Sequence, residues 1–99
     1  MRIAIVCATA LAVAPLIASA QDANAGRDLA AACAMCHGTN GRGTLGNEPL
    51  AGMAKEELAR VFKEFRSGAK PATVMHQIAK GYTDEQIDRI AAYFAARTK

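Results

Sequence analysis

Residues 33–37 read Cys-Ala-Met-Cys-His, and this short stretch decides the fold of the 99-residue chain. A disulfide between Cys33 and Cys36 would close a very small loop, and the stabilisation from closing a loop grows with its length. A chain of this size buries only ~60% of its unfolded surface and usually needs an additional cross-link or bound group. The two thiols are therefore expected to hold something larger than a disulfide.

The spacing of the two cysteines and the adjacent histidine is typical of covalent haem c attachment. The thiols of Cys33 and Cys36 can reach vinyl groups on one edge of a porphyrin, while His37, on the same turn, points its imidazole at the iron. A zinc site would need a second ligand pair, and residues 21–99 contain no other Cys or His than His76. A thioredoxin-like redox pair belongs in a βαβ unit, which this sequence does not predict. We therefore predict one covalent haem c, with His37 as an iron ligand.

An electron carrier with six-coordinate iron needs a second axial ligand from the far side of the haem. We predict that this ligand is Met75, which lies between two expected helices, where the chain can cross the haem face. Any single methionine, Met75 included, is more often a packing residue than a ligand. His76 and Met53 therefore stay open as alternatives. Adjacent residues point apart, so Met75 and His76 exclude each other. A five-coordinate haem that binds gas or peroxide would leave nothing opposite His37, and Met75 argues against it.

The motif is expected at the junction of a helix and a long loop. Residues 23–33 are rich in alanine, with Leu29 and Cys33 four positions apart, which favours a helix that brings Cys33 to a core and stops near residues 37–38. Residues 38–52 carry Pro49 and several glycines, and this density of turn formers predicts a loop. Loops of this length in a compact domain usually wrap around something.

Two amphipathic helices are predicted after the loop. The first covers residues 54–67 and ends at Gly68, and the second begins at Thr83, whose side chain is expected to form a capping box with Gln86. No run alternates apolar and polar residues for long enough to make a convincing strand. The predicted fold class is all-α, with three to four helices wrapped around one covalently attached haem. The expected core positions recur at i, i+3, i+4 and i+7 in both helices, as Leu58, Val61, Phe62 and Phe65 and as Ile87, Ile90, Ala91 and Phe94.

The first twenty residues have the pattern of a secretory signal peptide. Arg2 is followed by an apolar run over residues 3–17 and by small residues that predict cleavage after Ala20. The run is shorter than the ~20 residues needed to span a bilayer, so no stable membrane span is expected after cleavage. Cys7 would be removed with this segment. We expect a signal peptide over residues 1–20, one single-haem domain over residues 21–99, and a periplasmic location.

The charge of the chain is mildly basic, with a formal net charge of +3. This balance is too small and too dispersed for a nucleic-acid footprint, which needs clustered Lys and Arg side chains on one face. Basic side chains beside the haem edge could steer an acidic redox partner toward it. The candidates for this steering are Arg42, Lys55, Lys63, Arg66, Lys70 and Lys80.

The C-terminal half of the chain carries a family resemblance. The whole of residues 21–99 resembles a small class I cytochrome c, and residues 62–96 are most similar to the cytochrome subunit of flavocytochrome c sulfide dehydrogenase, here in a single-haem form. Cytochromes of the c4 and c5 type share the last part of this pattern. The stretches that carry the resemblance are Phe65-Arg66-Ser67-Gly68, Ala72-Thr73-Val74-Met75, Ile78-Ala79-Lys80-Gly81-Tyr82-Thr83-Asp84 and Ala92-Tyr93-Phe94.

The resemblance implies roles for five residues and a partner. It places haem attachment at Cys33 and Cys36, the proximal ligand at His37 and the distal ligand at Met75, and it makes the carbonyl of Pro49 the acceptor for the Nδ1 hydrogen of the proximal histidine. It implies an electron carrier without catalysis of its own, which accepts electrons from a flavoprotein sulfide dehydrogenase subunit. The alternative is a free-standing c4- or c5-like shuttle to a terminal oxidase or another periplasmic enzyme.

Overall fold

The computed structural model describes residues 24–99, so the predicted signal peptide and its cleavage after Ala20 lie outside the described part of the chain. Within residues 24–99 every regular element is helical, and the pairing of Thr44 with Asn47 is an isolated bridge. The all-α prediction is confirmed. No helix in this range is long and apolar enough to cross a bilayer. Residues 24–30 are helical, followed by η1 (Ala31–Cys33), α2 (Ala34–His37), η2 (Thr39–Gly41), α3 (Lys55–Ser67), α4 (Met75–Ala79) and α5 (Asp84–Ala95).

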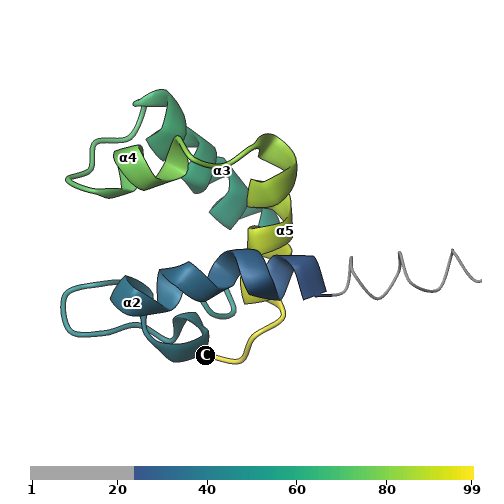
Figure 1. Cartoon of the computed structure of the whole chain (residues 1–99). Helices are drawn as coiled ribbons and strands as arrows, with labels where there is room; N and C mark the ends of the chain where they lie inside the picture. The colour runs from purple at the N-terminus through teal and green to yellow at the C-terminus, as the bar shows by residue number, and fades with distance from the viewer. Residues whose placement is uncertain (1–23) are drawn as a thin grey trace, which may run out of the picture.

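The first helical stretch runs from residue 24 through η1 and α2, and it stops where the sequence predicts. Its last residue is His37, because Gly38 turns the chain with φ of 83°. This stretch crosses α5 at close range (Figure 1). A Cβ on Gly26 would lie 2.7 Å from the carbonyl oxygen of Arg89, so the crossing requires a residue without a side chain.

The core lies between α3 and α5, which carry the two predicted apolar stripes. All four stripe positions of α5 are buried, whereas in α3 Leu58 and Phe62 are buried and Val61 and Phe65 are only half-buried. The stripe of α3 is therefore divided between the protein core and a second surface. That second surface belongs to the site described below.

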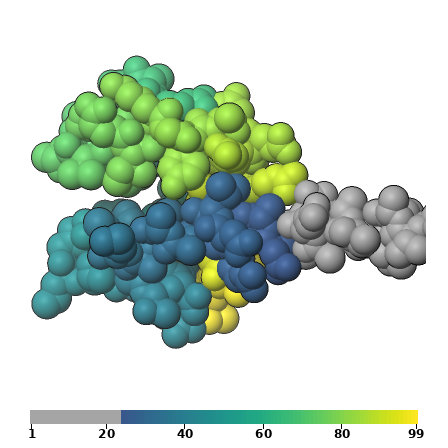
Figure 2. Space-filling model, viewed as in Figure 1, coloured from purple at the N-terminus to yellow at the C-terminus, as the bar shows by residue number. Residues whose placement is uncertain are grey.

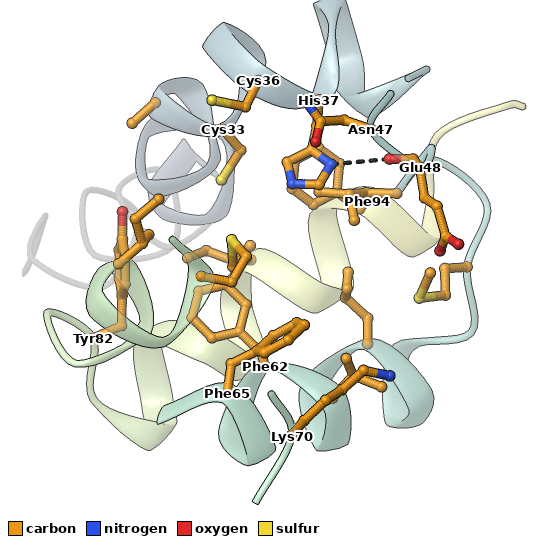
Figure 3. Close-up of a pocket in the computed structure, with 18 of the residues that line it drawn as sticks. Cys33, Cys36, His37, Asn47, Glu48, Phe62, Phe65, Lys70, Tyr82 and Phe94 are labelled. Atoms are coloured by element: carbon orange, nitrogen blue, oxygen red, sulfur yellow. Dashed lines mark hydrogen bonds between the residues drawn. The ribbon is translucent and has the colours of Figure 1, made fainter. Parts of the chain in front are cut away.

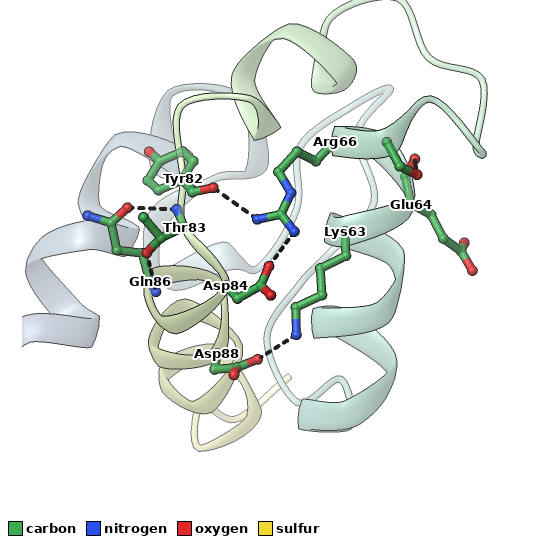
Figure 4. Close-up of polar contacts among 9 residues, drawn as sticks. Lys63, Glu64, Arg66, Tyr82, Thr83, Asp84, Gln86 and Asp88 are labelled. Atoms are coloured by element: carbon green, nitrogen blue, oxygen red, sulfur yellow. Dashed lines mark hydrogen bonds and ion pairs between the residues drawn. The ribbon is translucent and has the colours of Figure 1, made fainter.

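Polar contacts fix the start of α5 against α3 (Figure 4). The Arg66 guanidinium donates to the carbonyl of Tyr82 at 3.2 Å and forms an ion pair with Asp84. The predicted capping box at Thr83 is confirmed by both of its hydrogen bonds. The Lys63 ammonium lies 3.2 Å from the Asp88 carboxylate. Two of the cations expected to steer a partner, Lys63 and Arg66, thus hold α3 to α5 instead.

The short helix α4 is not predicted by the sequence, from which we expected only a connecting segment there. It has five residues, too few for an apolar period to show, and it packs against α3. Met75 is its first residue.

The described part of the chain forms two halves, with α3, α4 and the start of α5 above a hollow and residues 24–50 below it (Figure 2).

Candidate haem site

A cavity of about 520 Å³ lies between the two halves of the molecule. This volume is within the usual range for small-molecule and cofactor sites, ~300–1,000 Å³. Its walls are mainly apolar and come from the loop after the motif and from α3, α4 and α5. They include Val61 and Phe65 of α3, Met75 and Ile78 of α4, and Phe94 of α5.

The Cys-Ala-Met-Cys-His motif forms one wall of this cavity. Cys33, Cys36 and His37 all line it, and both thiols are free (Figure 3). Cys33 is half-buried and Cys36 is exposed. Burial, and to a lesser degree the neighbouring Cys36, raises the pKa of the Cys33 thiol. Two thiols of a single turn thus border the same apolar space that the imidazole of His37 enters.

The imidazole of His37 is oriented by a hydrogen bond from its Nδ1 to the carbonyl oxygen of Glu48, at 2.9 Å (Figure 3). A carbonyl can only accept, so Nδ1 carries the hydrogen and Nε2 keeps a lone pair for a metal ion. The expected acceptor, the carbonyl of Pro49, is wrong by one residue. The loop turns so that the carbonyl preceding the proline ring, and not its own, faces the histidine.

The loop that carries Glu48 folds back onto the motif and is joined to it by hydrogen bonds. The backbone N–H of Gly43 donates to the carbonyl of His37 at 2.6 Å, and the hydroxyl of Thr44 donates to the carbonyl of Cys36 at 3.0 Å. The expected loop over residues 38–52 is confirmed, with the short η2 turn inside it. It wraps around the histidine end of the cavity.

Among the candidates for a second iron ligand, Met75 and Met53 line the cavity with His37, and His76 does not. Met75 is half-buried at the first turn of α4. The Nδ1 atom of His76 is buried and finds no hydrogen-bond partner among residues 24–99. The structure therefore brings the predicted pair His37 and Met75 to one space and turns His76 away from it, as expected for adjacent residues.

Four polar residues of the cavity wall were not predicted as part of a site. Asn47 and Glu48 come from the loop, Lys70 follows α3, and Tyr82 precedes α5. The available signal was the position of the loop directly after the motif, which places its residues beside whatever the motif binds. Lys70 was expected beside the haem edge, as a cation that steers a partner and not as part of the binding cavity.

Residues 20–94 match the protein family described as cytochrome c oxidase, cbb3-type, subunit III. The chain belongs to this family of c-type cytochromes. The cytochrome is similar to the cytochrome subunit of sulfide dehydrogenase from Chlorobaculum tepidum, with 38% identity over 75% of this chain and 67% of that protein. It is also similar to cytochrome c-554(548) from Halomonas halodenitrificans, with 38% identity over 79% of this chain and 99% of that protein.

A solved structure of cytochrome c4 from Acidithiobacillus ferrooxidans has the same fold. It matches 73% of this cytochrome with a TM-score of 0.67 and 28% identity. The cytochrome spans about half of that chain, 49%.

Membership of this family implies covalent haem c with its iron, and the residues of the cavity fit that group. The paired thiols, the free Nε2 of His37 and the apolar walls are what a covalently bound porphyrin requires. The cytochrome is an electron carrier, like relatives that are cytochromes or the cytochrome subunit of a dehydrogenase.

Proposed function

We propose that this cytochrome carries single electrons in the periplasm, with haem c bound through Cys33 and Cys36 and its iron ligated by His37 and Met75. One observation carries the proposal, namely that His37, with Nε2 free, and Met75 line the same apolar cavity from the two halves of the molecule. The signal-peptide pattern of residues 1–20 supports the periplasmic location.

Haem c supplies a one-electron couple at its iron when it is bound. The protein orients the proximal imidazole through the carbonyl of Glu48 and presents a thioether through the first turn of α4. Apolar side chains on the walls, among them Phe62 and Phe94, exclude water from the space between them. A thioether ligand raises the reduction potential relative to a second histidine, which suits acceptance of electrons from a flavin.

The proposed donor is the flavoprotein subunit of a sulfide dehydrogenase. Oxidation of sulfide releases two electrons, and the reduced flavin passes them to the cytochrome one at a time, so each transfer oxidises the flavin by one electron and reduces the cytochrome by one. The 38% identity to the cytochrome subunit of sulfide dehydrogenase supports this assignment.

The proposed docking face surrounds the cavity on both halves of the molecule. The largest exposed apolar side chains of residues 24–99 come from the segments on either side of it. Arg42 and Lys80, on these same segments, and Lys55, at the start of α3, remain as steering cations. The exposed apolar residues are Met35, Leu45, Val74 and Ile78.

A free-standing shuttle to a terminal oxidase or another periplasmic enzyme is the second candidate. The observation that favours it is the 38% identity to cytochrome c-554(548), because that relative is named as a cytochrome and not as a subunit of a dehydrogenase. A five-coordinate haem for gas or peroxide is less well supported, because two thioethers, those of Met53 and Met75, line the same cavity as His37.

Visible and near-infrared spectra of the holoprotein test the ligand assignment. We expect a charge-transfer band between methionine sulfur and ferric iron, which Met75→Ala abolishes and both Met53→Ala and His76→Ala retain. Survival of the band in Met75→Ala, with its loss in Met53→Ala, would transfer the role to Met53.

The donor is tested separately with cell extract of the native organism. We expect sulfide to reduce the added cytochrome and a flavoprotein to co-purify with it. A monomer that sulfide does not reduce in extract would support the shuttle instead.

A further inference from the structure

Lys70 lies at the rim of a mainly apolar cavity, where its side chain is still exposed to solvent. It is the only Lys or Arg among the residues that line this cavity. Its Nζ lies 5.7 Å from the centre of the Phe65 ring, and its backbone N–H donates to the carbonyl of Glu64 at 3.2 Å. The contact with the aromatic face and the anchored backbone hold the ammonium group at the cavity.

Lys70 differs from the neighbouring cations of α3, which are already engaged by acids. Lys63 pairs with Asp88 and Arg66 with Asp84, whereas within residues 24–99 Lys70 forms no ion pair. An exposed cation at the rim of the cavity, without an anion of its own, suits an acidic group that extends from the ligand toward solvent.

The place of Lys70 relative to the motif identifies that acidic group. In Figure 3 the sulfurs of Cys33 and Cys36 lie on one side of the cavity, and the ammonium group of Lys70 lies across from them. The vinyl groups that react with cysteines and the propionate groups occupy opposite edges of a haem. We propose that the Lys70 ammonium group binds a propionate carboxylate of the haem.

This contact tunes the redox couple. A cation beside the propionate cancels negative charge that would otherwise favour the ferric state, so it raises the reduction potential. It also favours the ionised carboxylate and keeps the propionate from titrating near neutral pH. Glu48 and Tyr82 are the other titratable side chains on the cavity besides the motif, and Glu48 is the acid among the lining residues with which Lys70 could pair instead. The carboxylate of Glu64, whose carbonyl accepts from the Lys70 N–H, pairs with Arg60.

The test compares reduction potentials of holoproteins between pH 5 and pH 9. We expect Lys70→Met to lower the reduction potential at pH 7. The expected decrease is ~59 mV, which for one electron corresponds to a tenfold decrease in the ratio of reduced to oxidised protein. The potential of this variant should also become dependent on pH, and haem-methyl NMR shifts should titrate with it. Lys70→Arg should restore both properties. Lys80→Met, which removes a lysine that does not line the cavity, is the matched control and should leave both unchanged.

Glu48→Gln separates the haem carboxylate from the protein carboxylate. If the lysine binds the propionate, Lys70→Met lowers the potential by the same factor in the Glu48→Gln background as in the wild-type background. An effect that disappears in the double variant would assign Lys70 to Glu48 and overturn the proposal, as would a Lys70→Met profile identical to that of Lys80→Met. The inference rests on the proposed attachment at Cys33 and Cys36, whose failure would appear as loss of covalent haem in the unsubstituted protein.

Discussion

The orientation of His37 depends on a backbone carbonyl, so it is set by the path of a loop and not by a partner side chain. Gly41 lies at the centre of that loop. Its carbonyl accepts hydrogen bonds from the backbone N–H groups of Leu50 and Ala51 at 2.7 and 2.9 Å. These two residues follow shortly after Glu48 in the chain. The ring of Phe94 lies directly against the Cα of Gly41. Gly41 thus contacts the core on one side and holds the segment that orients His37 on the other.

We predict that Gly41→Ala lowers the free energy of unfolding by about 2–4 kcal/mol. The residue has φ of 71°, and an added Cβ would lie 2.6 Å from the Phe94 ring. Gly68→Ala is the control, because Gly68 has a similar φ of 84°, has no atom within 4 Å of the added Cβ and does not line the cavity, and the substitution should cost about 1 kcal/mol. Denaturant unfolding of the holoproteins measures both. Equal losses would show that the contact with Phe94 contributes nothing.

Residue types and spacing were enough to predict which side chains of the motif meet at one site. The spacing of Cys33, Cys36 and His37 requires them to share a turn, and Met75 could be selected because it lies between two helices. The acceptor for the histidine could not be predicted, since a carbonyl is present at every residue and only the loop conformation decides which one turns inward. That is why Glu48 replaces the expected Pro49.

At the scale of elements, periodicity predicts long helices well and short ones poorly. The helices α3 and α5 each extend over several turns, so their apolar stripes repeat and their bounds follow from Thr83 and Gly68. The helix α4 has too few residues for a repeat. An apolar stripe in the sequence also does not reveal which surface it packs against. Val61 and Phe65 line a cavity rather than the protein core.

The junction of α3 and α5 gives the stability of the cytochrome a dependence on pH. The hydrogen bond and charge of Arg66 hold the pKa of the Asp84 carboxyl below its usual value. A lowered pKa in the folded state stabilises the fold above the unfolded-state pKa of ~3.9, and this contribution disappears as the pH falls through the lower folded value.

We predict that Asp84→Asn lowers the melting temperature at pH 7 by about 1–3 °C, because the pair is exposed. The difference from wild type should persist down to about pH 4 and vanish below it. Glu85→Gln is the control for the charge at the N-terminus of α5, because Glu85 lies in the same first turn but pairs with Arg89. Thermal unfolding followed by circular dichroism measures all three proteins. A difference that grows below pH 4 would contradict the linkage to Arg66.

At the scale of the whole molecule, the protein core alone is thin. Among residues 24–99 the largest fully buried side chains are Phe94, Ile87 and Ile90, and alanines make up much of the remaining core. The cavity, by contrast, separates the two halves of the chain and has apolar walls on both. A large apolar cofactor between them therefore supplies contacts that join the halves, and folding is coupled to its binding.

The coupling predicts that a Cys33→Ala, Cys36→Ala double variant, which cannot form the thioether bonds, loses cooperative unfolding and much of its helix content. Without haem, apolar walls such as Val61 and Phe65 lack a packing partner, and so small a protein core does not offset the entropy of ordering the chain. Met35→Ala is the control, because Met35 lies between the two cysteines but is 90% exposed, and it should unfold like wild type. Far-ultraviolet circular dichroism during thermal unfolding measures both. A haem-free double variant that melts cooperatively at the wild-type temperature would show that the protein core suffices alone.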